Sequence, residues 1–199
     1  MSQYFENDDS VKSEIIKIRD RFGQFSFDFY SDNGVFSKDE VDYGTRLLIE
    51  TFLKSGNKGT ILDMGGGIGV ISIVLSKILN CHCTMSEINK RAVDLAKKNV
   101  LLNSLDGMVE VIESNAYENI KGEFDFVITN PPIRAGKKVV YEFLLNSIDY
   151  LKDKGELWFV MRKSHGAPSA KRDVEKVFAN CEIVKRDKGF YILRAIKNK

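Results

Sequence analysis

The sequence predicts an α/β fold in which helices cover both faces of a doubly wound, mostly parallel β-sheet. From residue 60 onward, short apolar segments alternate with helical segments, as in consecutive βαβ units, and such units build a parallel sheet. A glycine cluster directly follows the first apolar segment, which is typical of a strand-to-helix turn that approaches a ligand. Only the residues around Lys188 separate the last two strand-like segments, so a closing hairpin should make one strand antiparallel.

A small β-hairpin is predicted at the N-terminus, as an extension over residues 1–36 of a domain that spans residues 37–199. Residues 13–19 and 24–30 are strand-like, and a turn-like sequence joins them. The second strand places three phenylalanines on one face: Phe25, Phe27 and Phe29. We expect this face to pack the hairpin onto the domain rather than to stack nucleic-acid bases.

The first helix of the domain is predicted from a capping box. Ser37 and Glu40 have the S-x-x-E spacing of a helix N-terminus, and the apolar periodicity continues to about Gly56. Seven strands are predicted after it, over residues 60–64, 81–87, 108–114, 124–129, 155–163, 181–187 and 189–197. The helices between them are predicted over residues 71–79, 88–103, 139–151 and 169–178.

The composition is that of a folded chain without a membrane span. A hydrophobic content of 43% in 199 residues supports one core, and no run of about 18 apolar residues occurs. The N-terminal sequence is polar and acidic, unlike a targeting peptide, so we expect a cytoplasmic protein, by default a monomer. Three cysteines do not suggest a disulfide framework, and Cys81-His82-Cys83 is expected to be structural, with no metal.

The charge is unevenly distributed along the chain. Residues 134–199 hold 16 Lys and Arg against 8 Asp and Glu, whereas residues 1–133 hold 14 against 20. A positive C-terminal third suits a polyanion such as nucleic acid, although a solvated lysine-rich surface has the same composition.

The glycine cluster LDMGGGIG points to a ligand other than a dinucleotide. Its pattern is D-x-G-x-G-x-G, from Asp63 through Gly65, Gly67 and Gly69, and glycines there let the backbone approach a ligand closely. Val70 stands where the dinucleotide pattern needs a small residue. A carboxylate at Asp63 would repel a pyrophosphate but attract an ammonium group, so the pattern favours S-adenosylmethionine.

Two further strand ends supply candidate contacts to this cofactor. Glu87 lies 20 residues beyond Gly67, beside Ile88, and a carboxylate there can accept hydrogen bonds from both ribose hydroxyls. After the next strand, Asn115 and the backbone N–H of Ala116 could meet an adenine ring.

The tetrapeptide NPPI follows the strand over residues 124–129. Pro131 and Pro132 cannot continue a central strand, and they hold Asn130 extended. The side-chain and backbone oxygens of Asn130 therefore form two fixed acceptors. Such a pair matches the two hydrogens of an exocyclic amine, and it could aim the nitrogen lone pair at a methyl donor.

With these residues, the chain resembles the class I S-adenosylmethionine-dependent amino-methyltransferases. Residues 34–50, 129–138 and 166–172 resemble, more narrowly, the small-subunit (16S) ribosomal RNA guanine-N2 methyltransferases in a short, single-domain form. The resemblance implies the seven-stranded Rossmann-like methyltransferase sheet and target-amine contacts at Asn130 and Pro131. It also implies cofactor contacts at Asp63, Gly65, Gly67, Glu87 and Asn115, with Phe36 and Thr45 bordering the cofactor pocket.

The expected substrate is ribosomal RNA or the small ribosomal subunit. Basic residues follow the tetrapeptide and the fifth strand, and they are candidates for phosphate contacts: Arg134, Lys137, Lys138, Arg162 and Lys163. Many amino-methyltransferases have an aromatic residue at position 133, where this chain has Ile133, an apolar contact only. The alternatives are a protein glutamine amide, adenine in DNA or RNA, or a non-catalytic RNA-binding factor of the same fold.

Overall fold

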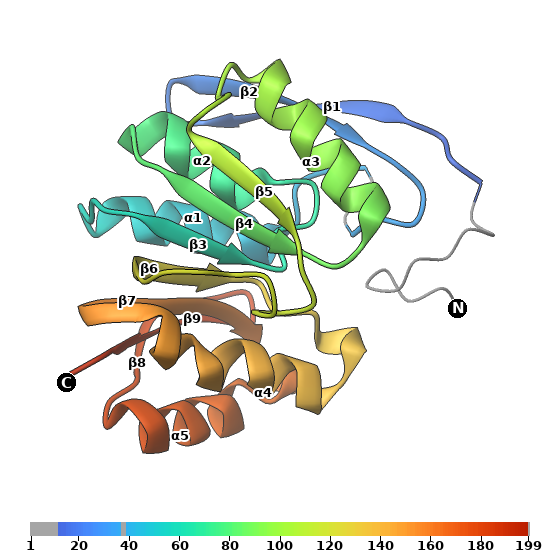
Figure 1. The fold of residues 1–199 in the computed structure, drawn as a ribbon. Coiled ribbons are helices and arrows are strands. Elements are labelled where there is room, and N and C mark those ends of the chain that lie inside the picture. The colour runs from blue at the N-terminus through green and yellow to red at the C-terminus, as the bar shows by residue number, and fades with distance from the viewer. Residues whose placement is uncertain (1–11, 37–38, 199) are drawn as a thin grey trace.

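The computed structural model describes residues 12–36 and 39–198 (Figure 1). Its strands are β1 (Ile16–Phe22), β2 (Phe25–Ser31), β3 (Ile61–Met64), β4 (Cys83–Glu87), β5 (Val109–Glu113), β6 (Phe124–Thr129), β7 (Leu151–Arg162), β8 (Glu182–Asp187) and β9 (Phe190–Ile196). Its α-helices are α1 (Tyr43–Lys54), α2 (Val70–Leu79), α3 (Lys90–Leu102), α4 (Lys137–Leu145) and α5 (Ala167–Phe178). Short 3₁₀ helices are η1 (Ile133–Ala135), η2 (Asn146–Tyr150) and η3 (Lys163–His165).

Seven strands form the central sheet in the order β5-β4-β3-β6-β7-β9-β8. Every neighbouring pair from β5 to β7 is parallel, and β9 is antiparallel to both β7 and β8. The predicted fold class is therefore confirmed, including the single antiparallel strand contributed by the closing hairpin. The chain reverses its direction of winding between β3 and β6, where ligands bind in open α/β sheets.

Side chains alternate between two cores, one on each face of the sheet. Along β3, Ile61 enters the core shared with α1, α2 and α3, whereas Leu62 enters the core shared with α4 and α5. Figure 1 shows the same division, with α4 and α5 on one side of the sheet and α1 to α3 on the other. This alternation follows from the two-residue period of a strand.

The N-terminal hairpin forms as expected and packs on the outside of α3. Phe27 and Phe29 are buried in the same core as α2 and α3. Asn99 in α3 and Asn103, directly after the helix, each exchange two hydrogen bonds with the backbone of β2, at 2.6 to 3.3 Å. The predicted packing role of the phenylalanine face is thus confirmed, while the domain boundary after residue 36 stays a prediction.

Three predicted element boundaries are wrong. The helix expected from Ser37, a residue outside the described ranges, begins at Tyr43, because the side chain of Asp42 caps it by accepting a hydrogen bond from Thr45 N at 3.0 Å. The helix expected over residues 139–151 ends at Leu145 and continues as η2, and β7 already begins at Leu151, which pairs with Phe124.

Among residues 12–36 and 39–198, no helix has the length and apolar character needed to cross a membrane.

Candidate active site

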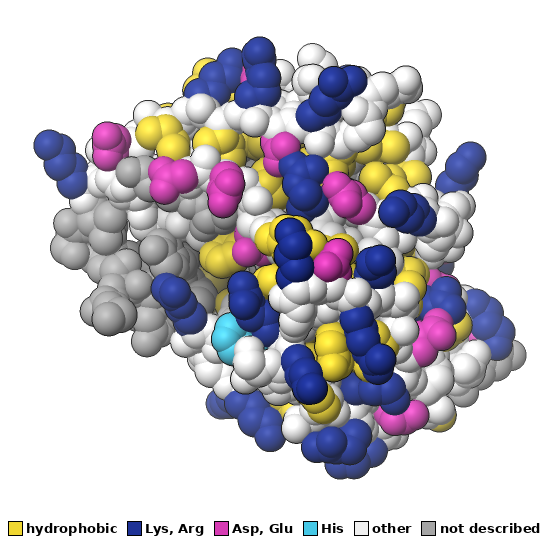
Figure 2. Space-filling model, turned by 180° about the vertical axis from the view of Figure 1, so that it is seen from behind, with side chains coloured by type: hydrophobic (Ala, Val, Ile, Leu, Met, Phe, Trp, Pro, Cys, Tyr) yellow, Lys and Arg dark blue, Asp and Glu magenta, His cyan; other side chains and the backbone are white. Residues whose placement is uncertain are grey.

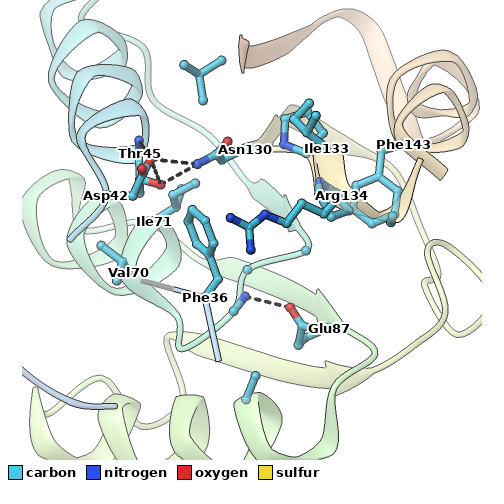
Figure 3. A pocket seen from close by; sticks show the side chains of 18 of the residues that line it. Phe36, Asp42, Thr45, Val70, Ile71, Glu87, Asn130, Ile133, Arg134 and Phe143 are labelled. Carbon is cyan, nitrogen blue, oxygen red and sulfur yellow. Dashed lines mark hydrogen bonds between the residues drawn. The ribbon is translucent and has the colours of Figure 1, made fainter. Parts of the chain in front are cut away.

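A pocket of about 690 Å³ opens where β3 to β7 end. Figure 3 shows this pocket between the start of α1, the glycine loop and the turn after β6. The structure brings most of the predicted site residues to its wall: Phe36, Thr45, Gly65, Gly67, Glu87, Ile88, Asn115, Ala116, Asn130, Pro131, Pro132, Ile133, Arg134 and Arg162. Predicted site residues that do not line it are Asp63, Gly69, Lys137, Lys138 and Lys163.

The glycine loop forms one wall because its backbone adopts conformations that favour glycine. Gly65 and Gly67 have φ angles of +69° and +58°. A Cβ on Gly65 would lie 2.8 Å from the Phe143 ring, and one on Gly66 would lie 2.4 Å from Met85, whereas a Cβ on Gly67 would meet nothing within 4 Å. The loop is thus packed tightly from behind and open at Gly67, where a ligand can approach the backbone.

Asp63 lies behind this loop and is fully buried. Its Oδ2 accepts hydrogen bonds from the backbone N–H and the hydroxyl of Ser72, at 3.1 and 2.8 Å, while its buried Oδ1 has no hydrogen-bond partner in the described part of the chain. Burial raises the pKa of Asp63 to about 7, and the negative charge of Glu87 adds to that rise. Asp63 therefore lies behind the loop and not in the pocket wall, and its contact with a cofactor stays a prediction.

Glu87 closes the end of β4 against the glycine loop. Its Oε2 accepts from Gly67 N at 2.9 Å, and its Oε1 accepts from the N–H groups of Ile88 and Asn89, both at 2.9 Å. Burial raises the pKa of Glu87 above its usual value. A carboxylate has about four acceptor positions, so three are filled in this state. A ribose that binds both oxygens of Glu87 must therefore share or displace one of these backbone bonds.

The loop after β5 is held in a sparsely populated conformation. Ala116 has a φ of +47°, in the left-handed region that non-glycine residues rarely adopt. Its carbonyl accepts hydrogen bonds from the hydroxyls of Ser86 and Ser114, at 2.6 and 2.9 Å. The neighbouring Asn115 is exposed and donates its amide hydrogen to Glu118 at 2.9 Å. The Asn115 oxygen is thereby left as the outward acceptor at the predicted adenine position.

Asn130 follows β6, and its side chain is oriented by the start of α1. Its Nδ2 donates to Asp42 Oδ2 at 3.1 Å and to Thr45 Oγ1 at 2.9 Å, as the dashed lines in Figure 3 show. A carboxylate can only accept hydrogen bonds, so the –NH2 end of the amide must face Asp42. The amide oxygen therefore points away from α1, and among the described residues it accepts no hydrogen bond.

This network links a helix cap to the predicted catalytic residue. Asp42 Oδ2 also accepts from Thr45 N, so one carboxylate oxygen both caps α1 and holds Asn130. Sequence reasoning missed Asp42 because the S-x-x-E pattern five residues earlier drew the helix start to Ser37. The residues Asp42 to Thr45 have the spacing of an N-cap and its N3 partner, which could have identified it.

The basic residues predicted to bind substrate are divided between the pocket and its surroundings. Figure 3 shows the Arg134 side chain extending into the pocket toward Phe36. Arg162 lines the pocket at the end of β7, with its guanidinium 4.3 Å from the ring centre of Phe190. Lys137 lies over Tyr141 on α4, outside the pocket. Figure 2 shows Lys and Arg side chains gathered over the lower part of the back face, with few Asp and Glu among them.

Two further aromatic residues in the pocket wall were not predicted. Phe143 comes from α4 and supports Gly65, and Phe190 comes from the start of β9. Periodicity marks Phe143 as a core residue, but no sequence signal places it under the glycine loop. The position of Phe190 depends on how β9 pairs with β7.

The cysteines are free and buried, as expected for structural thiols. No group of three or more His, Cys, Asp or Glu side chains within residues 12–36 and 39–198 is arranged to hold a metal ion.

Comparison with known protein families decides what kind of site this is. The family model of the methyltransferase small domain matches residues 26–194, from β2 to β9. The chain belongs to the methyltransferase small domain family. It is thus an S-adenosylmethionine-dependent methyltransferase, as expected from the glycine loop and Glu87.

Relatives within this methyltransferase family differ in length. The chain is 41% identical to the uncharacterized protein YbxB of Bacillus subtilis, over 98% of both chains. It is 32% identical to ribosomal RNA small subunit methyltransferase C of Erwinia tasmaniensis, over 83% of this chain and 48% of that protein. The chain therefore spans about half the length of the ribosomal RNA methyltransferases it matches.

Solved structures show the same methyltransferase fold at low identity. The T. thermophilus 16S rRNA N2 G1207 methyltransferase, in complex with AdoMet and guanosine, superimposes with a TM-score of 0.85 at 22% identity, over 92% of this chain and 51% of that one. The ribosomal protein L11 methylase of Lactobacillus delbrueckii gives a TM-score of 0.65 at 18% identity, over 85% and 84% of the two chains.

Three features in and behind the wall of this pocket fit S-adenosylmethionine. An orphaned carboxylate oxygen lies behind the loop, a glycine backbone is open toward the pocket at Gly67, and a carboxylate with one remaining acceptor position lies at Glu87. The carboxylate behind the loop matches the ammonium of the cofactor, the open backbone at Gly67 matches its methionine chain, and Glu87 matches its ribose.

Proposed function

We propose that this methyltransferase transfers a methyl group to the exocyclic amine of a guanine in small-subunit ribosomal RNA, in the cytoplasm. The observation that carries the proposal is the orientation of Asn130, whose amide oxygen faces away from Asp42 and accepts no hydrogen bond among the described residues. An –NH2 group is the natural donor to such an oxygen.

Asn130 acts by holding and aligning the amine. The lone pair of an exocyclic amine is delocalised into the base, so the nitrogen is a weak nucleophile until its hydrogens are held out of plane. The side-chain oxygen of Asn130 and the carbonyl before Pro131 each accept one of these hydrogens. Alignment of this kind can contribute several of the roughly 7–11 kcal/mol that positioning supplies.

No strong base is required to complete the transfer. When bound, S-adenosylmethionine supplies a methyl carbon on a sulfonium, and the carbon–nitrogen bond forms as the carbon–sulfur bond breaks. The nitrogen then carries a positive charge and is acidic, so it loses its proton to water. The cofactor is held by Glu87, Gly67 and Asn115. Asp63 balances the positive charge of the cofactor from behind the loop.

The distribution of positive charge supports a nucleic-acid substrate. Arg134 and Arg162 line the pocket, and further Lys and Arg side chains gather over the lower part of the back face of the molecule (Figure 2). Phosphate contacts of this kind position a nucleic acid without reading its sequence. Similarity to ribosomal RNA methyltransferases supports the choice of ribosomal RNA.

The proposal is tested by transfer of tritiated methyl groups to ribosomal particles from a strain that lacks the gene. Mass spectrometry of the digested RNA should reveal a guanosine methylated on N2, and Asn130→Ala should abolish the transfer while cofactor affinity stays within a few-fold. A methyl label found in adenosine or in a protein glutamine would show that the substrate is that group and not guanine. If no ribosomal particle accepted the label, ribosomal RNA would be refuted as the target.

A further inference from the structure

Four side chains form a continuous stack beside the pocket. The guanidinium of Arg162 lies 4.3 Å from the ring centre of Phe190, and the ring centres of Phe190 and Tyr43 are 5.7 Å apart. The ammonium of Lys188 lies 4.6 Å from the ring centre of Tyr43. The order along this stack is cation, ring, ring and cation, across the end of β7, the start of α1 and the β8–β9 turn, and the planes of its two rings are tilted by 47° to each other.

Backbone pairing fixes the inner part of this stack. Arg162 and Phe190 are directly opposite each other on the antiparallel strands β7 and β9. The start of α1 closes one edge of the Phe190 ring, because a Cβ on Gly44 would lie 2.8 Å from Phe190 Cε1. Phe190 is only 9% exposed. A ring that is closed on its edge by backbone cannot swing away, so it gives the guanidinium a fixed surface to lie against.

Arg162 is the end of the stack that lies at the pocket wall. Its side chain is exposed at the pocket wall, and among residues 12–36 and 39–198 it makes no ion pair with a carboxylate. A guanidinium with one face on a ring has its other face available, and such planes stack on unpaired nucleobases. The β6 and β7 strands are neighbours, and Asn130 after β6 and Arg162 at the end of β7 both line the same pocket.

We propose that Arg162 is the stacking platform for the unpaired base that enters the pocket, with Phe190 and Tyr43 as its support. This role goes beyond the phosphate contact expected of a basic residue at this position, and it rests on the proposed function. The base lies on the outer face of the Arg162 guanidinium with its amine toward Asn130, while Ile133 contributes an apolar contact. The ligand class is a purine base in single-stranded or looped RNA.

A fluorescent base separates stacking from a phosphate contact. The probe is a short single-stranded RNA with one 2-aminopurine, which has the same 2-amine as guanine and loses fluorescence when it stacks. The full chain, saturated with S-adenosylhomocysteine, should bind the probe and quench it. Arg162→Lys keeps the charge and removes the flat surface, so we expect about ten-fold weaker binding and loss of the quench, with an unchanged dependence on salt.

Two other variants complete the test. Phe190→Leu keeps Arg162 and removes its support, so it should give a partial loss of the quench, and thermal unfolding would show whether the variant is folded. Lys77→Gln removes one exposed charge at the far end of α2 and should bind within two-fold of wild type. Arg162→Lys with wild-type affinity and quench would instead establish a phosphate contact and overturn the platform.

The experiments test the stacking platform and the proposed function separately. A wild-type protein that leaves the probe fluorescent overturns the platform, whether or not ribosomal RNA is methylated. A quench that depends on Arg162, together with no methyl transfer to ribosomal particles, supports the platform and places the methylated base in another RNA.

Discussion

Asn130 Nδ2 lies 3.1 Å from Asp42 Oδ2, a hydrogen bond between residues 88 positions apart in the sequence. The same oxygen accepts from Thr45 N and so caps α1. The N-terminus of α1 is therefore connected directly to the side chain that we expect to hold the target amine. If the Asn130 amide were rotated by half a turn, its –NH2 group would face the amine of the target base. The oxygen that accepts a hydrogen bond from that amine would then be lost.

Asp42→Ser should separate the two roles of Asp42. Serine caps helices about as well as aspartate, but its hydroxyl is one bond shorter and does not reach Asn130. We expect kcat to fall about ten-fold or more because the amide is no longer held in one orientation. The melting temperature and the cofactor Kd, measured by thermal unfolding and calorimetry, should change little.

The matched control for this variant is Asp94→Ser, the same substitution at an exposed position of α3. It should leave kcat unchanged. An Asp42→Ser enzyme with wild-type kcat would show that Thr45 alone orients Asn130, and the link to the helix cap would then have no catalytic role.

Glu87→Gln should weaken cofactor binding by about ten-fold or more. Glutamine offers one acceptor oxygen where three backbone N–H groups now bind, and its –NH2 would face one of those donors. Loss of a hydrogen bond to a charged group has a cost on the order of 2 kcal/mol. Calorimetric titration with S-adenosylhomocysteine measures the effect. An affinity within two-fold of wild type would exclude Glu87 as the ribose ligand.

The buried carboxyl of Asp63 should make stability depend on pH. Its pKa is raised to about 7 in the folded protein, above the value of an exposed carboxyl. Between these two values the folded state binds one more proton than the unfolded state, so the free energy of unfolding should fall as pH rises from about 4 to about 7. Asp63→Asn should lack this pH dependence. Urea unfolding between about pH 4 and pH 7 measures the free energy of unfolding of both proteins.

Binding of the cofactor should also depend on the protonation of Asp63. If Asp63 ionises to balance the ammonium of the cofactor, binding near pH 6.5 should release a proton from the protein. Calorimetry in two buffers of different ionisation enthalpy detects this release, and Asp63→Asn should abolish it. Equal proton release by the wild type and by Asp63→Asn would mean that the titrating group is another residue.

The sequence was sufficient for the features that depend on local pattern. The strand β6 has the predicted boundaries, and Gly65, Gly67 and Glu87 lie at strand ends that the alternation of elements places on one edge of the sheet. Features that depend on contacts between distant segments could not be read in this way. The residue that caps α1, Asp42, lies 88 positions before Asn130 and is also hydrogen-bonded to it.

Register explains the rest of what the sequence did not reveal. Lys154 and Gly155 look like a turn before a strand, yet β7 begins at Leu151 because that residue pairs with Phe124 across an irregular step. The pairing of β7 with β9 likewise sets Arg162 opposite Phe190. A one-residue shift would send Phe190 to the other face of the sheet, so the aromatic support of Arg162 cannot be predicted from composition.

Gly44→Ala should destabilise the protein although it improves a helix. Alanine in place of a helical glycine normally stabilises by about 1 kcal/mol. Here the new Cβ would lie 2.8 Å from Phe190 Cε1 and 3.0 Å from Asp42 Oδ2. Phe190 is buried and cannot yield freely, so overpacking by roughly 1–3 kcal/mol should exceed the gain in helix propensity.

The same substitution should also lower activity, because the two atoms it displaces belong to the Asn130 network and to the support of Arg162. We therefore expect a lower melting temperature together with a reduced kcat and an unchanged cofactor Kd. A stabilised Gly44→Ala protein would show that α1 can move away from β9 at little cost. In that case neither Asp42 nor Phe190 would be held firmly enough to position the substrate, so this single measurement bears on both sides of the pocket.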